Sequence, residues 1–181
     1  MNGARVLLLA AGRGKRAGGP KAWRDHGGKT LLEAHLEFFR RFLGPAGISV
    51  AIQDEWRARC AALSPETVWV SADPDAAPMD TLQRLISSSP AAIRSFVLHV
   101  DMPIFERRVY ESLWSASGDV VVPVFDGHRG HPVLLSDAAL NEIKRLDPLA
   151  DRLDSWLRRR RVLEVAVSSD AIRWNMNEMV S

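Results

Sequence analysis

The sequence predicts a three-layer α/β/α fold in which helices cover both faces of a mainly parallel sheet. Short apolar runs alternate along the chain with segments whose apolar residues recur at helical spacing. This alternation is typical of parallel strands joined by crossover helices. Near residues 120–135, two apolar runs are separated only by a Gly-rich connection, which predicts a small antiparallel addition to the sheet.

The elements of the first half follow from apolar spacing and capping residues. Residues 6–10 predict a central strand. Thr30 and Glu33 form a capping box that begins a helix, and Gly44 with Pro45 ends it. The next expected elements are strands at 48–52, 67–70 and 96–100, helices at 55–63 and 81–87, and an irregular acidic loop at 71–78.

The second half of the chain continues the alternation. We expect helices at 107–115, 138–145 and 149–160, and strands at 120–124, 133–135 and 162–167. In open α/β sheets, ligands bind beyond the carboxyl ends of the strands. The loop at 11–21 and Asp101 each follow an expected strand, so both should lie at this edge of the sheet.

Length and composition fit one domain, which we expect to span residues 1–181. The chain has 181 residues, of which 46% are apolar and 25% charged, as in ordinary globular domains. A net charge of only +2 gives no basis for a nucleic-acid partner. Cys60 is the single cysteine, which excludes an internal disulfide. With no visible leader peptide or membrane-spanning run, we expect a cytoplasmic monomer or homodimer that does not bind membranes.

The most informative segment is the loop at residues 11–21, which follows the first strand. Its glycines allow the backbone to approach a ligand closely and to point N–H groups at it. The loop also carries four cations, Arg13, Lys15, Arg16 and Lys21. Amides and cations in this density predict a site for a polyphosphate.

Two common phosphate-binding motifs can be tested by their spacing. A Walker A motif needs a glycine five positions before its Gly-Lys-Thr end, but the residue at that distance from Gly28 is Trp23. The dinucleotide fingerprint Gly-x-Gly-x-x-Gly/Ala fits Gly12, Gly14 and Ala17. It also requires a helix that begins inside the motif, and the following Gly-Gly-Pro blocks one. An NAD-type oxidoreductase stays open as an alternative.

The pattern that fits the whole loop is Leu-Ala-Ala-Gly-x-Gly-x-Arg, a short spacer and Pro-Lys, carried by residues 9–21. In this pattern the chain resembles the MobA/MocA-like nucleotidyltransferases, a family that includes the molybdenum-cofactor cytidylyl- and guanylyltransferases. The resemblance implies a Rossmann-like fold and a Mg²⁺-dependent reaction. In it, a nucleoside monophosphate passes from a nucleoside triphosphate, with CTP favoured and GTP next, to a small phosphorylated acceptor such as molybdopterin, and pyrophosphate leaves.

The same resemblance assigns roles to individual residues. Arg16 would hold the β- and γ-phosphates, and Lys21 would stabilise charge at the α-phosphate, so that these two and Asp101 are the implied catalytic residues. Thr81 would contact the nucleotide, although Asp80 or Thr81 as a simple helix N-cap is the alternative. The implied nucleotide-binding residues are Leu9, Ala10, Ala11, Gly12, Arg13, Gly14, Lys21 and Thr81.

Asp101 carries the expected metal site. It directly follows an apolar strand, and Pro103 keeps the chain extended after it. Mg²⁺ takes one or two carboxylates together with substrate phosphate oxygens. The family has its metal aspartate at this Asp-x-Pro position, which implies Mg²⁺ at Asp101. The guanylyltransferase branch often has asparagines in its C-terminal tail, which implies Asn175 or Asn177 as the second ligand, and Asn177 is the expected one. A helix N-cap or turn aspartate and a polar surface tail are the alternatives.

A second stretch of resemblance lies at residues 127–135, where the cytidylyltransferase branch has a Gly-His-Pro sequence near its acceptor. It implies that Arg129 and His131 contact an acceptor phosphate, whereas a surface hairpin is the alternative. His99, on an expected strand, is interpreted as structural. A non-catalytic nucleotide-binding protein of the same fold, whose altered tail has lost the metal, also stays open.

Overall fold

A computed structural model of the chain describes residues 1–14 and 18–175. Its central element is a sheet of eight strands in the order β3, β2, β1, β4, β7, β5 and β6, with β8 paired to β5. The strands are β1 (Ala4–Leu9), β2 (Ile48–Ile52), β3 (Val68–Ser71), β4 (Arg94–His99), β5 (Val120–Phe125), β6 (His128–Arg129), β7 (Val133–Ser136) and β8 (Leu163–Ala166).

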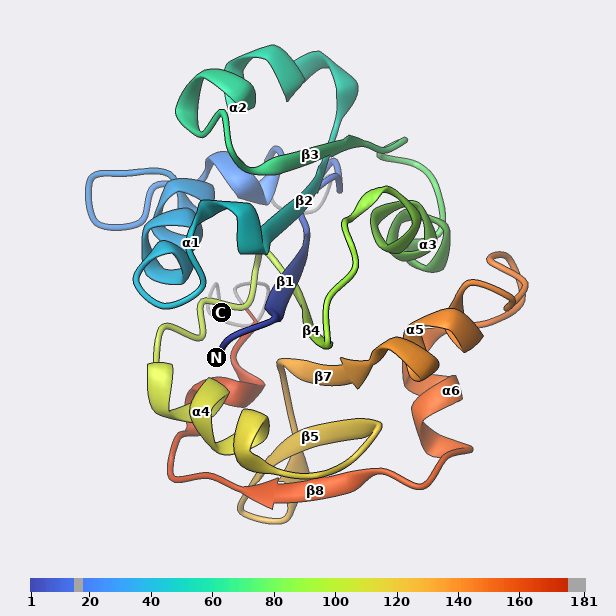
Figure 1. The fold of residues 1–181 in the computed structure, drawn as a ribbon. Helices are drawn as coiled ribbons and strands as arrows, with labels where there is room; N and C mark the ends of the chain where they lie inside the picture. The colour runs from blue at the N-terminus through green and yellow to red at the C-terminus, as the bar shows by residue number, and fades with distance from the viewer. Residues whose placement is uncertain (15–17, 176–181) are drawn as a thin grey trace.

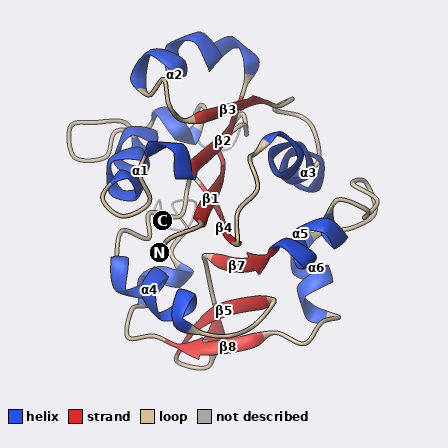
Figure 2. Cartoon of the chain, viewed as in Figure 1, coloured by secondary structure: helices blue, strands red, loops and turns tan. Residues whose placement is uncertain are grey.

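Helices cover both faces of this sheet, which confirms the three-layer α/β/α fold (Figures 1 and 2). The helices are α1 (Leu31–Arg40), α2 (Arg57–Leu63), α3 (Pro78–Ser88), α4 (Arg107–Ser115), α5 (Asp137–Ile143) and α6 (Leu153–Arg158). Strand β1 shows how alternation serves the two faces. Val6 and Leu8 belong to the core under α1 and α4, whereas Leu7 and Leu9 belong to the core under α3 and α5.

The sheet is parallel in its first half and mixed in its second. β1 pairs in parallel with both β2 and β4, and β2 with β3. β7 runs antiparallel to both β4 and β5, so the predicted antiparallel addition is inserted within the sheet. The chain returns through a two-residue turn at Asp126 and Gly127, whose φ angles are 49° and 72°. Positive φ at both positions suits the tight turns of hairpins.

Two expected helices have different boundaries. The helix expected at 81–87 begins at Pro78, after the N-cap Ala77, because proline is favoured in the first helical turn. Asp80 and Thr81 are therefore inside the first turn, and the N-cap alternative for them is wrong. The helix expected at 149–160 is confined to α6, since the Asp147 carboxylate accepts the Leu149 amide at 2.9 Å and holds a turn there.

Other boundaries shift by less. The helix begun by Thr30 has the predicted capping box and ends at Arg40. The helix expected at 55–63 begins as a 3₁₀ turn, Asp54–Trp56, before α2. Among the described residues, none of the helices has the length and apolar character that a bilayer crossing needs.

Candidate active site

The candidate site lies where β1 and β4 end side by side. These strands are parallel neighbours, with Leu9 opposite His99 in the register. The backbone continues the pairing one step further, since the Val100 amide donates to the Leu9 carbonyl at 3.0 Å. The Gly-rich loop after β1 and Asp101 after β4 therefore leave the sheet at the same edge, as the sequence predicted.

An ion pair joins the two segments. Lys21 begins the 3₁₀ turn Lys21–Trp23 that follows the loop, and its Nζ lies 2.5 Å from Oδ2 of Asp101. Both side chains are largely buried, with exposed fractions of 21% for Lys21 and 10% for Asp101. When a ligand binds beside the loop, the lysine can pair with its phosphate and the aspartate with the metal ion that accompanies it, in place of the contact between the two side chains.

Glycine is required where the loop closes on itself. Gly14 has φ of +62°, and a Cβ there would lie 1.9 Å from the Gly19 carbonyl oxygen. The Gly19 amide donates to the Gly14 carbonyl at 3.3 Å. The backbone segments at Gly14 and Gly19 are therefore in direct contact, and they close the base of the loop. Arg16, between these glycines, lies outside the described residues, and its phosphate-binding role stays a prediction.

Arg13 extends from the loop to the segment after β3. Its Nε donates to Oδ2 of Asp75 at 2.8 Å, and its Nη2 lies 2.6 Å from the same oxygen. Both side chains are about half exposed, at 46% and 50%, and an ion pair this open to solvent contributes little to stability. The hydrogen bond and charge of Asp75 raise the pKa of Arg13. A phosphate can therefore replace Asp75 at low cost.

A cavity of about 570 Å³ opens beside the end of β1. Its wall combines the strand ends with the start of α3 and the segment from Pro148 to Leu157. Leu9, Met79 and Leu82 form part of an apolar surface, and His99 and His131 also line the cavity. Thr81, predicted to touch the nucleotide, is buried with 6% exposure and is not among the residues that line the cavity, so its contact with the nucleotide stays a prediction.

The two histidines face each other because of strand register. β7 pairs antiparallel with β4, and Val97 lies opposite Val133. Continued by two residues, this register brings His99 opposite His131, and their ring centroids are 6.4 Å apart. Burial lowers the pKa of His131 to about 4, and it lowers that of His99 as well. Both rings are therefore neutral at pH 7.

The neutral state limits what His131 can do. Its Nδ1 is buried, with no hydrogen-bond partner among the described residues. The ring also has a hydrogen bond to the Val97 backbone, which places the single proton of the neutral ring on its other nitrogen. Nδ1 can therefore only accept a hydrogen bond, and it brings no positive charge to a phosphate. Arg129, its predicted companion, instead donates to Oε1 of Glu164 on β8 at 2.7 Å. The structure brings His131 to the cavity wall and does not bring Arg129 there, so the acceptor role of Arg129 stays a prediction.

The donor set suits a magnesium ion shared with a triphosphate. Across residues 1–14 and 18–175, no cluster of three or more His, Cys, Asp or Glu side chains could hold a metal by itself. Asp101 offers a carboxylate beside the phosphate loop, and Mg²⁺ accepts one carboxylate with phosphate oxygens and water. Asn177, the expected second ligand, lies outside the described residues.

Three contributors to this edge were not predicted from the sequence. Gln53 directly follows β2, and its Nε2 donates to the Gly12 carbonyl at 3.4 Å. Its position after a strand end was an available signal. Asp75 lay in a segment recognisable only as acidic. His99 was interpreted as structural, yet it lines the cavity, and only the β4–β7 pairing indicates this.

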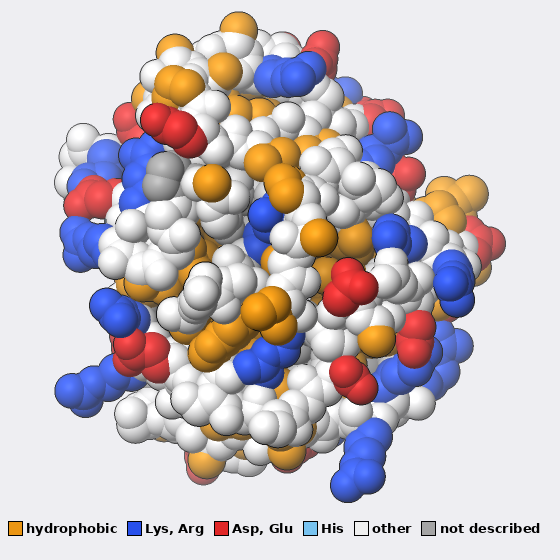
Figure 3. Space-filling view, in the orientation of Figure 1, with side chains coloured by type: hydrophobic (Ala, Val, Ile, Leu, Met, Phe, Trp, Pro, Cys, Tyr) orange, Lys and Arg blue, Asp and Glu red, His pale blue; other side chains and the backbone are white. Residues whose placement is uncertain are grey.

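Charge is distributed without one dominant sign on the face that Figure 3 presents. There, Lys and Arg are interspersed with Asp and Glu, and apolar side chains lie between them. This fits the small net charge of +2.

A mainly parallel sheet, with a Gly-rich loop after β1 and a lysine–aspartate pair between the ends of β1 and β4, is the arrangement of a nucleotidyltransferase-type α/β domain. Residues 6–165 match the family model of the MobA-like NTP transferase domain, and the chain belongs to that family. Membership disfavours the dinucleotide reading of Gly12 and Gly14. In agreement, the described residues 18–20 form no helix, and the first regular element after them is the 3₁₀ turn at Lys21.

Individual relatives share this class. The chain is 28% identical over 157 residues to the molybdenum cofactor guanylyltransferase of Rhizobium meliloti (strain 1021), covering 84% of this chain and 67% of that protein. It is 33% identical over 135 residues to the 2-C-methyl-D-erythritol 4-phosphate cytidylyltransferase of Cereibacter sphaeroides (strain KD131 / KCTC 12085), covering 67% of this chain and 59% of that protein. The chain thus spans about two thirds or less of the length of these curated relatives.

A solved structure shares the fold. The manganese complex of Rv0371c from Mycobacterium tuberculosis H37Rv is 24% identical, with a TM-score of 0.66, over 92% of this chain and 89% of that chain.

Proposed function

We propose that this chain is a Mg²⁺-dependent nucleotidyltransferase that moves a nucleoside monophosphate from CTP or GTP to a small phosphorylated acceptor. The observation that carries the proposal is the Lys21–Asp101 pair, 2.5 Å long, beside the phosphate loop. The relatives named for cytidylyl and guanylyl transfer support the reaction class.

The reaction requires positioning and charge stabilisation more than covalent chemistry. Amides of the loop at 11–14 bind the triphosphate, with Arg16 expected at its β- and γ-phosphates. An acceptor phosphate oxygen attacks the α-phosphorus in line, the bond to the pyrophosphate oxygen breaks, and pyrophosphate leaves. The Lys21 ammonium leaves Asp101 and stabilises the negative charge that develops at the α-phosphate.

Asp101 would hold the metal, and Asn177 is its proposed second ligand. When bound, Mg²⁺ neutralises charge on the triphosphate oxygens. The manganese complex of the mycobacterial neighbour supports a divalent metal in this fold. An acceptor phosphate is ionised at pH 7, so the reaction needs no general base. The neutral state of His99 and His131, with the pKa of His131 at about 4, is compatible with that.

The acceptor is proposed to occupy the cavity of about 570 Å³ next to the loop. Its apolar side chains suit the body of an organic acceptor such as molybdopterin, and His131 offers a neutral ring nitrogen to a polar group of that ligand. This assignment keeps the acceptor next to Leu9, at the end of the strand that leads into the phosphate loop.

The test is a ligand panel read by thermal stability and pyrophosphate release. CTP, GTP, UTP, ATP, dTTP and NAD are each added with and without Mg²⁺. A ligand at about 100 times its dissociation constant stabilises the fold by roughly 2.7 kcal/mol. A Mg²⁺-dependent shift with one triphosphate supports the proposal and identifies the base. A shift with NAD alone, indifferent to metal, overturns it.

Catalysis is tested separately with phosphorylated acceptors, molybdopterin among them. Pyrophosphate release that needs both the stabilising triphosphate and an acceptor supports transfer. Tight triphosphate binding without release with any acceptor favours the non-catalytic alternative.

A further inference from the structure

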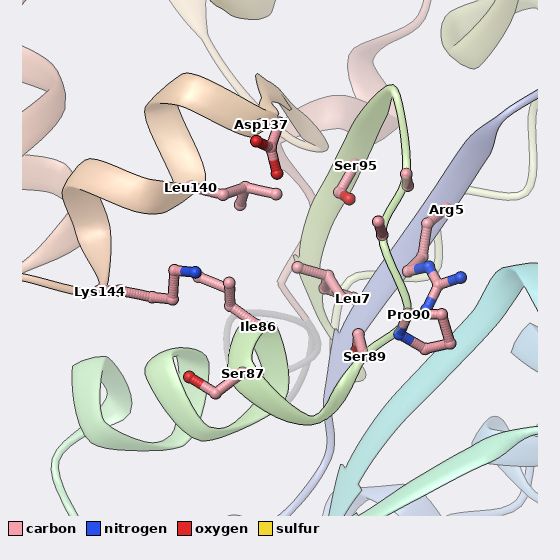
Figure 4. Close-up of a pocket in the computed structure, with 12 residues that line it drawn as sticks. Arg5, Leu7, Ile86, Ser87, Ser89, Pro90, Ser95, Asp137, Leu140 and Lys144 are labelled. Atoms are coloured by element: carbon pink, nitrogen blue, oxygen red, sulfur yellow. The ribbon is translucent and has the colours of Figure 1, made fainter.

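A second cavity lies near the amino-terminal ends of β1 and β4, whereas the candidate active site lies at their carboxyl-terminal ends. It measures about 190 Å³ and is lined by the start of β1, the end of α3 and one side of α5 (Figure 4). Arg5 lines this cavity and Leu9 the first one. They are four residues apart on the same strand, a separation of roughly 13 Å at about 3.3 Å per residue.

Arg5 is a buried cation without an anionic partner. Its side chain extends from β1 to lie beside Pro90 (Figure 4), and the residue is only 7% exposed. Nε is buried with no hydrogen-bond partner, and Nη1 makes one long bond of 3.4 Å to Ser49 Oγ. In the part of the chain that the structure describes, no carboxylate pairs with this guanidinium. Burial lowers the pKa of Arg5, and a buried charge is costly unless it is paired.

The sheet around Arg5 is polar where the rest of this face is apolar. Arg5 points to the same face as Leu7, because the two are separated by one residue on a strand. Ser95 lies opposite Arg5 on β4, and Ser49 opposite Leu7 on β2. Both serines are buried. Ser95 lines the cavity together with Arg5 and gives its floor a hydroxyl group, whereas Ser49 lies outside the lining and only bonds the Arg5 guanidinium.

The rim adds a second cation. Lys144, from the end of α5, and Ser87, from the end of α3, are exposed and line the cavity. Asp137 also lies on the rim, where its Oδ2 already accepts a hydrogen bond from Asn141 at 2.9 Å. Two cations thus face one carboxylate. The cavity volume of about 190 Å³ is several times the ~30 Å³ that one water molecule takes in the liquid, so the cavity has room for a small anion.

We propose that this cavity binds a tetrahedral oxyanion of the phosphate class, held by Arg5 at the floor and Lys144 at the rim. A guanidinium presents several donors in a fixed plane and is well suited to phosphate oxygens. The bound anion supplies the charge that Arg5 lacks. It arrives either as free phosphate or as the phosphoryl end of a larger metabolite, since the rim is open to solvent. This site is separate from the proposed triphosphate site.

The test uses inorganic phosphate as the probe. All measurements are made on a chain that carries Lys21→Ala, because this substitution weakens phosphate binding at the proposed active site. We expect phosphate to raise the melting temperature above that in NaCl of equal ionic strength. In this background, Arg5→Met should weaken phosphate binding, measured by calorimetry, at least about tenfold. Lys144→Ala should weaken it less. An Arg5→Met chain that binds phosphate as well as its parent overturns the proposal, and so does a parent with no phosphate-specific shift.

Two further arms keep the test decisive. If Arg5→Met does not fold, Lys144→Ala decides, because this exposed side chain can be removed without disturbing the core. Weaker phosphate binding supports the site, and unchanged binding overturns it. Glycerol phosphate distinguishes the source. Tighter Arg5-dependent binding of the ester than of phosphate assigns a metabolite, and the reverse order assigns free phosphate.

Discussion

Lys21 and Asp101 lie 80 residues apart in the sequence, and the fold brings the ammonium and carboxylate within 2.5 Å of each other. The pairing follows from topology. β1 and β4 are parallel neighbours, so the segments that follow them emerge together. Each charge keeps the other ready for a ligand that carries both a phosphate and a divalent metal ion.

Removal of either member of this pair should abolish most of the catalysis. We expect Lys21→Ala and Asp101→Ala each to lower turnover by two orders of magnitude or more, about 3 kcal/mol of transition-state stabilisation. Pyrophosphate release under saturating triphosphate and acceptor measures the effect, and circular dichroism checks that the variants are folded. Near-normal turnover in either variant would remove that residue from the mechanism.

Lys29 offers a matched control for Lys21. It is an exposed lysine that pairs with Glu37 on α1, away from the loop. Lys29→Ala removes the same charge from the same part of the sequence and should leave turnover unchanged. An equal loss in both lysine variants would indicate that net charge, rather than the position of Lys21, matters.

Gly14 should be intolerant of a side chain, and Gly12 tolerant. A Cβ at Gly14 would lie 1.9 Å from the Gly19 carbonyl oxygen, whereas a Cβ at Gly12 meets nothing within 4 Å. Gly14 also has φ of +62°, which costs a non-glycine residue roughly 1–2 kcal/mol. We expect Gly14→Ala to lower the melting temperature and weaken triphosphate binding. Gly12→Ala should have the melting temperature of the unsubstituted chain. Equal melting temperatures for the unsubstituted chain and both variants would contradict the close contact between Gly14 and Gly19.

Much of the site edge could be predicted because it depends on strand order alone. The strand at 6–10, the loop after it and Asp101 at a second strand end followed from apolar runs and from the rule for ligand sites in α/β sheets. The histidine pair could not be predicted, since it depends on the register between β4 and β7. Asp75 and the cavity wall after Pro148 depend on irregular segments, whose paths have no periodic signal.

The Arg13–Asp75 pair should compete with triphosphate binding. Its Nε–Oδ2 distance is 2.8 Å, and Asp75 brings negative charge to the loop that is to receive phosphates. We expect Asp75→Asn to tighten triphosphate binding by roughly two- to fivefold, because ion pairs exposed to solvent are weak, and by less at high salt. Asp80→Asn is the control, because it removes a carboxylate paired with Arg84 instead. Weaker or unchanged binding in Asp75→Asn alone would show that Asp75 does not compete.

The free energy of unfolding should fall as the pH is lowered from about 6.5 towards 4. In this range buried histidines stay neutral in the folded chain, whereas in the unfolded chain they take up protons. Burial lowers the pKa of His35 and of His131 to about 4 in the folded chain, against about 6.5 when unfolded. Between these values the unfolded state binds more protons, so stability is present above pH 6.5 and is lost on acidification. Each histidine contributes a slope approaching 1.4 kcal/mol per pH unit.

His35 allows this loss to be assigned to one ring. It lies on α1, and its Nε2 is 2.8 Å from the Val100 carbonyl oxygen. His35→Gln keeps a donor for that carbonyl and removes the titrating group. Urea unfolding at pH 4.5 to 8 should show a shallower decline for the variant below pH 6.5, and parallel curves above pH 7.5. Identical declines in the two proteins would mean that His35 does not remain neutral in the folded state over this range.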